Sequence, residues 1–236
     1  MNHLDISYWK NRKKKKIKTF VSSFINYNFY NSIKDKNIDI FRVDIEEIAL
    51  NHDINSINKI SLNDFIINIR NNFINNSFLA VDIPIVDLYK DGNDVSNVVD
   101  IYKKSNADFI ILNIEHNIAS IAKKLSNYGI PYIVSFKNNY EDGDLRINGC
   151  IEELIHLGNT GSYLIITENL NEQFYTKVRN SCPIPVISDN LNKDSDGHYL
   201  LLSKIIGLIE NKNSFLNIKD LVSQSYDIYF NKINEK

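Results

Sequence analysis

Acidic and polar side chains follow several short apolar segments of this chain, and their types suit metal and acid–base chemistry. The segments end on or beside Asp44, Asp82, Asn113, Ser135 and Glu168. Mg²⁺ in proteins is bound by a few carboxylate and amide oxygens, and it keeps several bound waters that a substrate can displace. A further carboxylate across the same opening could then act as a general base. One such residue alone is more often a helix cap or a turn residue, so it is their repetition that favours a functional site.

The segments that precede these residues are the expected strands, and helical patterns separate them. Eight β-branched or aromatic runs are found, and such runs are typical of buried strands. They span residues 19–24, 38–43, 78–83, 109–114, 132–136, 163–167, 185–188 and 199–202. Apolar residues at spacings of three and four predict helices over 61–75, 95–104, 118–125, 151–157 and 173–178. Gly129 is the expected stop of the third of these helices.

Alternating strands and helices favour parallel pairing with helical crossovers, because each strand must be reached from the opposite end of its neighbour. Strands that are apolar throughout are buried on both faces. Eight such units predict an α/β fold, a (β/α)₈ TIM barrel, in which the carboxyl ends of the strands carry the chemistry. We expect residues 1–17 to form a basic N-terminal segment and 18–236 to form a single barrel domain with a C-terminal helical extension over 214–233. An open doubly wound sheet is the alternative, but no GxGxxG motif follows the first strand.

Composition excludes several classes of protein. The chain has 236 residues, of which 43% are hydrophobic and 24% charged, with 27 basic and 29 acidic side chains. This balance argues against a nucleic-acid partner, and no apolar stretch is long enough to predict a membrane span. The basic run from Lys10 to Lys18 is the local exception, and a solvated segment is favoured over an RNA-binding or membrane-surface patch. Cys150 and Cys182 have no metal-site spacing, so we expect reduced thiols in a cytoplasmic protein.

Short motifs along the chain occur in the order found in one enzyme family. They are Asp39-Ile40-Phe41-Arg42-Val43-Asp44, Asn51-His52-Asp53, Ile60-Ser61-Leu62-Asn63-Asp64, Ala80-Val81-Asp82-Ile83-Pro84, Gly129-Ile130-Pro131, Ile165-Ile166-Thr167-Glu168, Ile184-Pro185-Val186-Ile187 and Asp196-Gly197-His198. Together they resemble the motifs of the ketopantoate hydroxymethyltransferases, also called 3-methyl-2-oxobutanoate hydroxymethyltransferases, almost from end to end.

The resemblance implies a function in pantothenate biosynthesis. It implies a barrel in which Mg²⁺ or a similar cation holds the carboxylate and ketone oxygens of 3-methyl-2-oxobutanoate. Asp44 and Asp82 would bind both metal and substrate, and Glu168 would be the catalytic base that removes the proton beside the ketone. The resulting enolate would attack the methylene group of the co-substrate 5,10-methylenetetrahydrofolate and give 2-dehydropantoate. The resemblance also implies a homo-oligomer, a decamer in that family.

The chain departs from the family inside the expected site. Ile45 stands at a substrate-binding Ser, Ile111 at a substrate-binding Lys, and Asn113 at a third metal-binding acid. Asn113 would then be a neutral metal ligand, or Glu115, two positions further on, would replace it. Ser135 stands at a family His, and several motif glycines are replaced. Two alternatives therefore stay open: a non-catalytic barrel that serves as a binding or assembly protein, and a related metal-dependent lyase of another α-keto acid.

Overall fold

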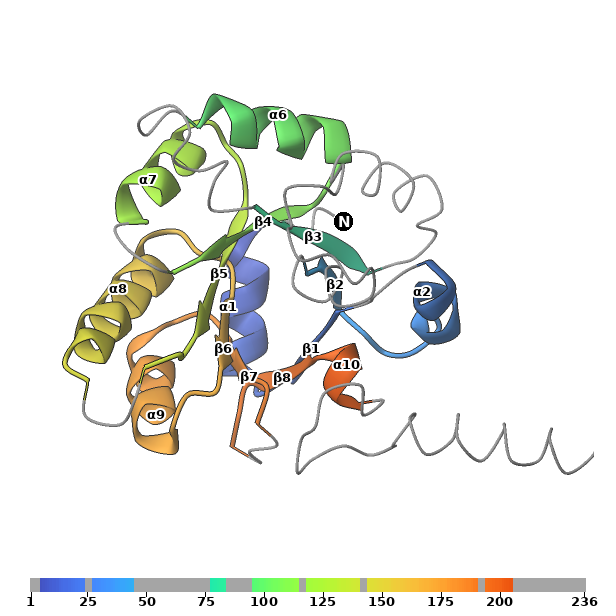
Figure 1. The fold of residues 1–236 in the computed structure, drawn as a ribbon. Helices are drawn as coiled ribbons and strands as arrows, with labels where there is room; N and C mark the ends of the chain where they lie inside the picture. Colours follow the sequence, from blue (N-terminus) through green and yellow to red (C-terminus); the bar gives the residue numbers. More distant parts are fainter. Residues whose placement is uncertain are drawn as a thin grey trace, which may run out of the picture.

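The architecture was obtained as a computed structural model, which describes residues 5–23, 27–44, 77–83, 95–114, 118–140, 144–190 and 194–205. Its eight parallel strands form a closed barrel in sequence order, with β8 pairing back to β1 (Figure 1). The strands are β1 (Thr19–Ser23), β2 (Ile40–Val43), β3 (Phe78–Asp82), β4 (Phe109–Asn113), β5 (Tyr132–Lys137), β6 (Ile165–Glu168), β7 (Val186–Ser188) and β8 (Gly197–Leu200). The predicted TIM barrel is confirmed, and the open sheet is excluded.

The strand predictions hold in number and order, and the largest shift concerns β8. The last strand was predicted over 199–202, whereas β8 begins at Gly197 and ends at Leu200. Gly197 pairs with Thr19, and a Cβ atom built on it would lie 1.8 Å from the Thr19 carbonyl oxygen. The close approach of these two backbones explains why a glycine extends the strand at this position.

Helices cover the outside of the barrel, as Figure 1 shows for α6 to α9. The described helices are α1 (Ile6–Lys14), α2 (Tyr27–Ile33), α6 (Ser96–Ser105), α7 (Ala119–Asn127), α8 (Arg146–Thr160), α9 (Glu172–Ser181) and α10 (Leu202–Ile205). Local signals set their ends: the Asn171 side chain accepts a hydrogen bond from the Phe174 amide at the start of α9, and Gly129, with φ of +69°, follows α7 as predicted.

Alternation along the strands divides the apolar side chains into an inner and an outer core. On β4, Phe109 and Ile111 pack in the barrel interior, whereas Ile110 and Leu112 pack beneath the outer helices. This follows from the period of two in a strand. The same alternation sends Asn113, the last residue of β4, toward the interior side at the carboxyl end of the barrel.

Helix α1 lies against the amino-terminal end of the barrel, so the predicted basic segment is partly a buried element. Trp9 is fully buried and its ring lies 5.8 Å from that of Phe78 and 6.1 Å from that of Phe109. Lys13 donates hydrogen bonds to the carbonyl oxygens of Arg179 and Cys182 at 2.5 and 2.7 Å. Lys10, Lys14, Lys15 and Lys16 are exposed, as the favoured interpretation of a solvated segment predicts, whereas Lys13 is held against the end of α9.

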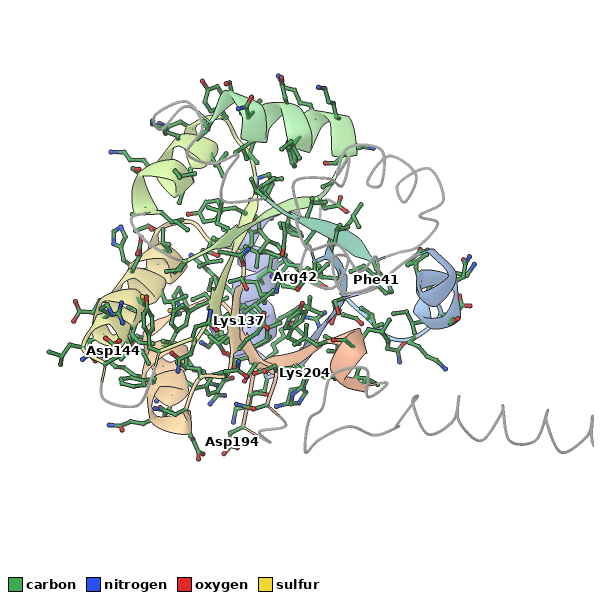
Figure 2. All side chains as sticks on the ribbon, in the orientation of Figure 1. Phe41, Arg42, Lys137, Asp144, Asp194 and Lys204 are labelled. Atoms are coloured by element: carbon green, nitrogen blue, oxygen red, sulfur yellow. The ribbon has the colours of Figure 1, made fainter. Side chains whose placement is uncertain are left out.

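Figure 2 shows side chains filling the space between the barrel and its outer helices. Both cysteines are free thiols buried among them. Among the described residues, no helix is long and apolar enough to cross a membrane. The predicted helix over 61–75, the motif Asn51-His52-Asp53 and the extension over 214–233 lie outside the described residues.

Candidate active site

Three acidic side chains occupy the carboxyl-terminal mouth of the barrel. Asp82 and Glu168 are the last residues of β3 and β6, and Asp44 directly follows β2. All three are buried, at 3%, 5% and 4% exposure. Buried carboxylates are costly unless they are paired, so a neighbouring positive charge is required.

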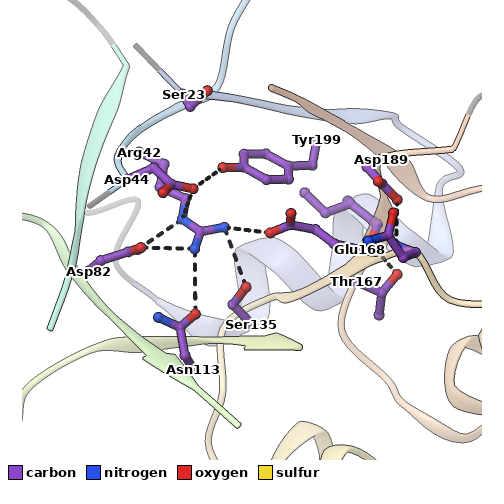
Figure 3. A network of polar contacts seen from close by, with 12 residues as sticks. Ser23, Arg42, Asp44, Asp82, Asn113, Ser135, Thr167, Glu168, Asp189 and Tyr199 are labelled. Carbon is purple, nitrogen blue, oxygen red and sulfur yellow. Dashed lines mark hydrogen bonds and ion pairs between the residues drawn. The ribbon is translucent and has the colours of Figure 1, made fainter. Parts of the chain in front are cut away.

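That charge is the guanidinium of Arg42, which stands at the centre of the mouth (Figure 3). Arg42 lies on β2 and is itself only 3% exposed. Its Nε and Nη2 atoms donate to the two carboxylate oxygens of Asp82 at 2.8 and 2.9 Å, which is the paired geometry of a strong ion pair. Its Nη1 donates to Glu168 Oε1 at 3.2 Å, and its Nε lies 3.4 Å from Asp44 Oδ2.

Two neutral side chains complete the ring of acceptors. Nη1 of Arg42 donates to Ser135 Oγ, and Nη2 donates to Asn113 Oδ1, each at 3.4 Å. A guanidinium has five N–H groups, one on Nε and two on each terminal nitrogen. Each of the five therefore has an acceptor, and these acceptors come from β3, β4, β5 and β6.

Tyr199 on β8 covers the remaining side of the guanidinium. The ring centroid of Tyr199 lies 5.0 Å from Cζ of Arg42, a cation–π distance, and its hydroxyl donates to Asp44 Oδ2 at 2.6 Å. Burial opposes the charge of Arg42, but the carboxylates of Asp44 and Asp82 outweigh it and raise the pKa of the guanidinium well above its ordinary value. Arg42 is therefore a permanent cation.

Glu168 has the most informative acidity in the cluster. Burial raises the pKa of its carboxyl from 4.5 to about 7, and the charge of Arg42 opposes this rise. A carboxyl with a pKa near neutrality can both accept and return a proton, as general acid–base catalysis requires. The environment of Glu168 is thus compatible with the role that the resemblance implies.

The structure brings together some of the predicted site residues and separates others. Asp44, Asp82, Asn113 and Glu168 all contact the guanidinium. Ile111 lies one inward position below Asn113, within the apolar interior, and has no polar group to offer a substrate. Ile45 and Glu115 lie outside the described residues.

The predicted metal ligands can be tested against a divalent cation by the chemistry of their oxygens. Arg42 already engages both oxygens of Asp82 and one oxygen of Asn113. A divalent ion among them would stand beside a fixed positive charge, and at 4 Å with an effective dielectric constant of 20 this repulsion, about 8 kcal/mol, cancels the attraction of one carboxylate at the same distance. Among the described residues, no group of three or more His, Cys, Asp or Glu side chains is arranged to hold a metal. With Arg42 in this position, the residues do not fit the ion.

Arg42 and Tyr199 were not among the predicted site residues. A sequence signal for Arg42 exists, because an arginine within the apolar run Ile40-Phe41-Arg42-Val43 must be buried and needs several acceptors. The family motif that contains Arg42 instead predicts a ligand at Asp44, two residues later. Tyr199 carries no comparable signal, since most buried tyrosines only pack.

The fold is shared with α/β-barrel enzymes of known structure. Three of the similar structures are a candidate phosphonomutase from Burkholderia cenocepacia J2315, 2,3-dimethylmalate lyase of the PEP mutase/isocitrate lyase superfamily, and the tryptophan synthase complex from Pyrococcus furiosus. Their TM-scores are 0.62, 0.57 and 0.56, with 8%, 9% and 13% identity. The matches cover 96%, 98% and 80% of this chain and 100%, 88% and 90% of those chains. At such identities the likeness extends to the fold alone.

Sequence comparison points to one kind of enzyme. The chain is similar to the 3-methyl-2-oxobutanoate hydroxymethyltransferases of Aliarcobacter butzleri strain RM4018 and Buchnera aphidicola subsp. Acyrthosiphon pisum strain APS, with 21% and 25% identity. The matches span 68% and 67% of this chain and 66% of each relative, just under two thirds of their length. No model of a known protein family matches the chain. The relatives are thus enzymes of the hydroxymethyltransferase kind, at low identity.

Proposed function

We propose that this protein catalyses hydroxymethyl transfer to 3-methyl-2-oxobutanoate, with 5,10-methylenetetrahydrofolate as the one-carbon donor. The observation that carries the proposal is the convergence of Asp44, Asp82 and Glu168 on one buried cation at the barrel mouth. These are the acids at which the motifs of the chain resemble the hydroxymethyltransferases. The similarity of the chain to relatives of that name supports the same reaction.

In the proposed reaction Glu168 acts as the base. It removes the proton from C3 of the keto acid, and the electrons of that C–H bond move toward the ketone oxygen. The enolate carbon then forms a bond to the methylene carbon of the folate, and water supplies the hydroxyl oxygen to the same carbon, while its two C–N bonds break. The two folate nitrogens take up one proton from water and the proton that Glu168 removed, and tetrahydrofolate leaves. The positive charge of Arg42, 3.2 Å from Glu168, would stabilise the negative oxygen that develops on the substrate. The magnesium ion implied by the resemblance has no part in these steps, because the residues do not fit it.

Deuterium exchange at C3 tests the first step without the folate. The protein is incubated with 3-methyl-2-oxobutanoate in D₂O, and loss of the C3 proton is followed by nuclear magnetic resonance. We expect exchange by the wild type and a loss of about 10²-fold or more in Glu168→Gln, the range that a positioned base contributes. Glu172→Gln is the matched control, because Glu172 is an exposed residue in the first turn of α9. An equal rate in the wild type and Glu168→Gln would exclude Glu168 as the base.

A non-catalytic barrel is the second candidate, and one observation favours it. All five N–H groups of Arg42 already have protein acceptors, so the cluster is complete as a structural network. Under this hypothesis the protein binds or assembles with a partner and no exchange occurs. Absence of exchange, together with absence of keto-acid binding by calorimetry, would support it over the enzyme. The decameric assembly implied by the resemblance is likewise a proposal, which sedimentation velocity can test.

A further inference from the structure

We propose that the guanidinium of Arg42 is a built-in cation that takes the place of a divalent metal, so that this barrel mouth does not bind Mg²⁺ or Mn²⁺. The inference concerns the cation alone. It does not depend on the proposed reaction, because cation binding can be measured without a substrate.

The charge of Arg42 lies where the three acids converge. Asp44, Asp82 and Glu168 reach the mouth from three different strand ends, and the group that they share as a neighbour is the guanidinium of Arg42. Figure 3 shows the guanidinium between Asp82 on one side and Glu168 on the other. An arginine starting from β2 thus places its charge where carboxylates from separate strands converge.

The carboxylate oxygens of Asp82 and Asp44 already accept hydrogen bonds within the protein. Asp82 presents both carboxylate oxygens to Arg42, at 2.8 and 2.9 Å, so each oxygen already accepts a hydrogen bond from the guanidinium. Asp44 Oδ2 receives the Tyr199 hydroxyl at 2.6 Å and faces Arg42 at 3.4 Å. A metal ion would have to break these contacts and leave the guanidinium buried beside it.

The positive charge of Arg42 is permanent. A guanidinium stays protonated throughout the accessible pH range, so the mouth cannot release this cation by titration. It also cannot leave by dissociation, because it is covalently part of β2. The guanidinium therefore balances one of the three negative charges permanently, without any ion taken from solution, and a chelator cannot remove it.

Removing the guanidinium should convert the cluster into a cation site. In Arg42→Ala the oxygens of Asp44, Asp82 and Asn113 lose their shared donor and face an emptied space. Hard oxygen ligands of this kind suit Mg²⁺ and Mn²⁺. Arg42→Lys keeps a positive charge in the mouth and should behave as the wild type does. Arg12→Ala is the matched control, because Arg12 also pairs with both oxygens of an aspartate, Asp39, but at the opposite end of the barrel.

Mn²⁺ is the probe, and its binding is read from the loss of the electron paramagnetic resonance signal of free Mn²⁺. We expect no Asp82-dependent binding by the wild type, Arg42→Lys or Arg12→Ala. In Arg42→Ala we expect one Mn²⁺ per chain, bound at least about tenfold more tightly than by the wild type, and a loss of that binding in Arg42→Ala/Asp82→Asn. Mn²⁺ should also raise the melting temperature of Arg42→Ala alone.

Two results would overturn the proposal. One is wild-type binding of one Mn²⁺ per chain that Asp82→Asn abolishes, since the metal would then share the mouth with Arg42. The other is a folded Arg42→Ala that binds Mn²⁺ no better than the wild type. If Arg42→Ala does not fold, Arg42→Met replaces it, and the wild-type measurement still decides by itself whether the mouth takes the metal.

Discussion

Replacing Arg42 by methionine should destabilise the barrel more than removal of any surface charge. Methionine keeps an unbranched apolar stem of similar reach, so little packing volume is lost, while the charge and five hydrogen-bond donors disappear. The carboxylate of Asp82 then remains buried, at 4% side-chain exposure, without its two hydrogen bonds of 2.8 and 2.9 Å. Breaking a buried ion pair by removing one partner costs about 3–5 kcal/mol.

The loss of stability in Arg42→Met can be measured in two ways. Urea denaturation at pH 7 should show a free energy of unfolding lower by about 3–5 kcal/mol. For a domain of this size each kcal/mol lowers the melting temperature by about 2–4 °C, so thermal melts should shift by about 6–20 °C. The double variant Arg42→Met/Asp82→Leu should recover part of the loss, because it also removes the unpaired carboxylate, and the double-mutant cycle then gives the coupling energy.

Arg146→Met serves as the control, because Arg146 also pairs with an aspartate, Asp144, but its side chain is 69% exposed. Its unfolding midpoint should be unchanged within error, since solvent screens such pairs. A loss below about 1 kcal/mol in Arg42→Met would mean that the mouth pair behaves like a surface pair. The description of Arg42 as the buried cation that stabilises the acids would then be refuted.

Three further predictions concern the mouth, the base of the barrel and a strand contact. Because burial raises the pKa of Glu168 to about 7, the stability that its protonated form contributes is complete below about pH 4.5 and is lost as the pH rises through 7. Glu168→Gln should therefore match the wild type near pH 4 and exceed its unfolding free energy above pH 7; an equal difference at both pH values would contradict the shift. Trp9→Ala should cost about 3–5 kcal/mol in chemical denaturation, because this fully buried ring closes the amino-terminal end; a loss under about 1 kcal/mol would show that α1 is dispensable. Gly197→Ala should lower the melting temperature strongly, because its Cβ would lie 1.8 Å from a backbone oxygen. Gly149→Ala is the control: Gly149 lies in α8 with open space around it, and the alanine should raise the free energy of unfolding by about 0.5–1 kcal/mol. Similar melting temperatures for the two variants would argue against the close contact between β8 and β1.

Hydrophobic periodicity was sufficient to predict the barrel. Eight runs of β-branched and aromatic residues, separated by helical patterns, leave few arrangements that bury both faces of every strand. The acids at the strand ends could be predicted for the same reason, because parallel strands bring their carboxyl ends to one side. Element boundaries were less accurate, as β8 shows, since the Gly197 contact depends on a strand 178 positions earlier in the chain, at Thr19.

The identity of the central cation could not be predicted. The sequence indicated that Asp44, Asp82 and Glu168 would gather, and from their types it predicted a metal ion as the positive charge among them. Whether a nearby side chain could supply that charge depends on the direction in which β2 presents Arg42 and on the distances across the barrel. Those are set by strand tilt and register in the closed sheet, which join residues far apart in sequence.

The sequence by itself determined the class of fold, the order of its strands and the gathering of acidic groups at one end of the barrel, because these follow from local periodicity and chain direction. Only the tertiary structure decided that Arg42 and Tyr199 complete the cluster and that α1 closes the opposite end. Such contacts depend on side chains meeting across the closed sheet, and no pattern within a single segment records them.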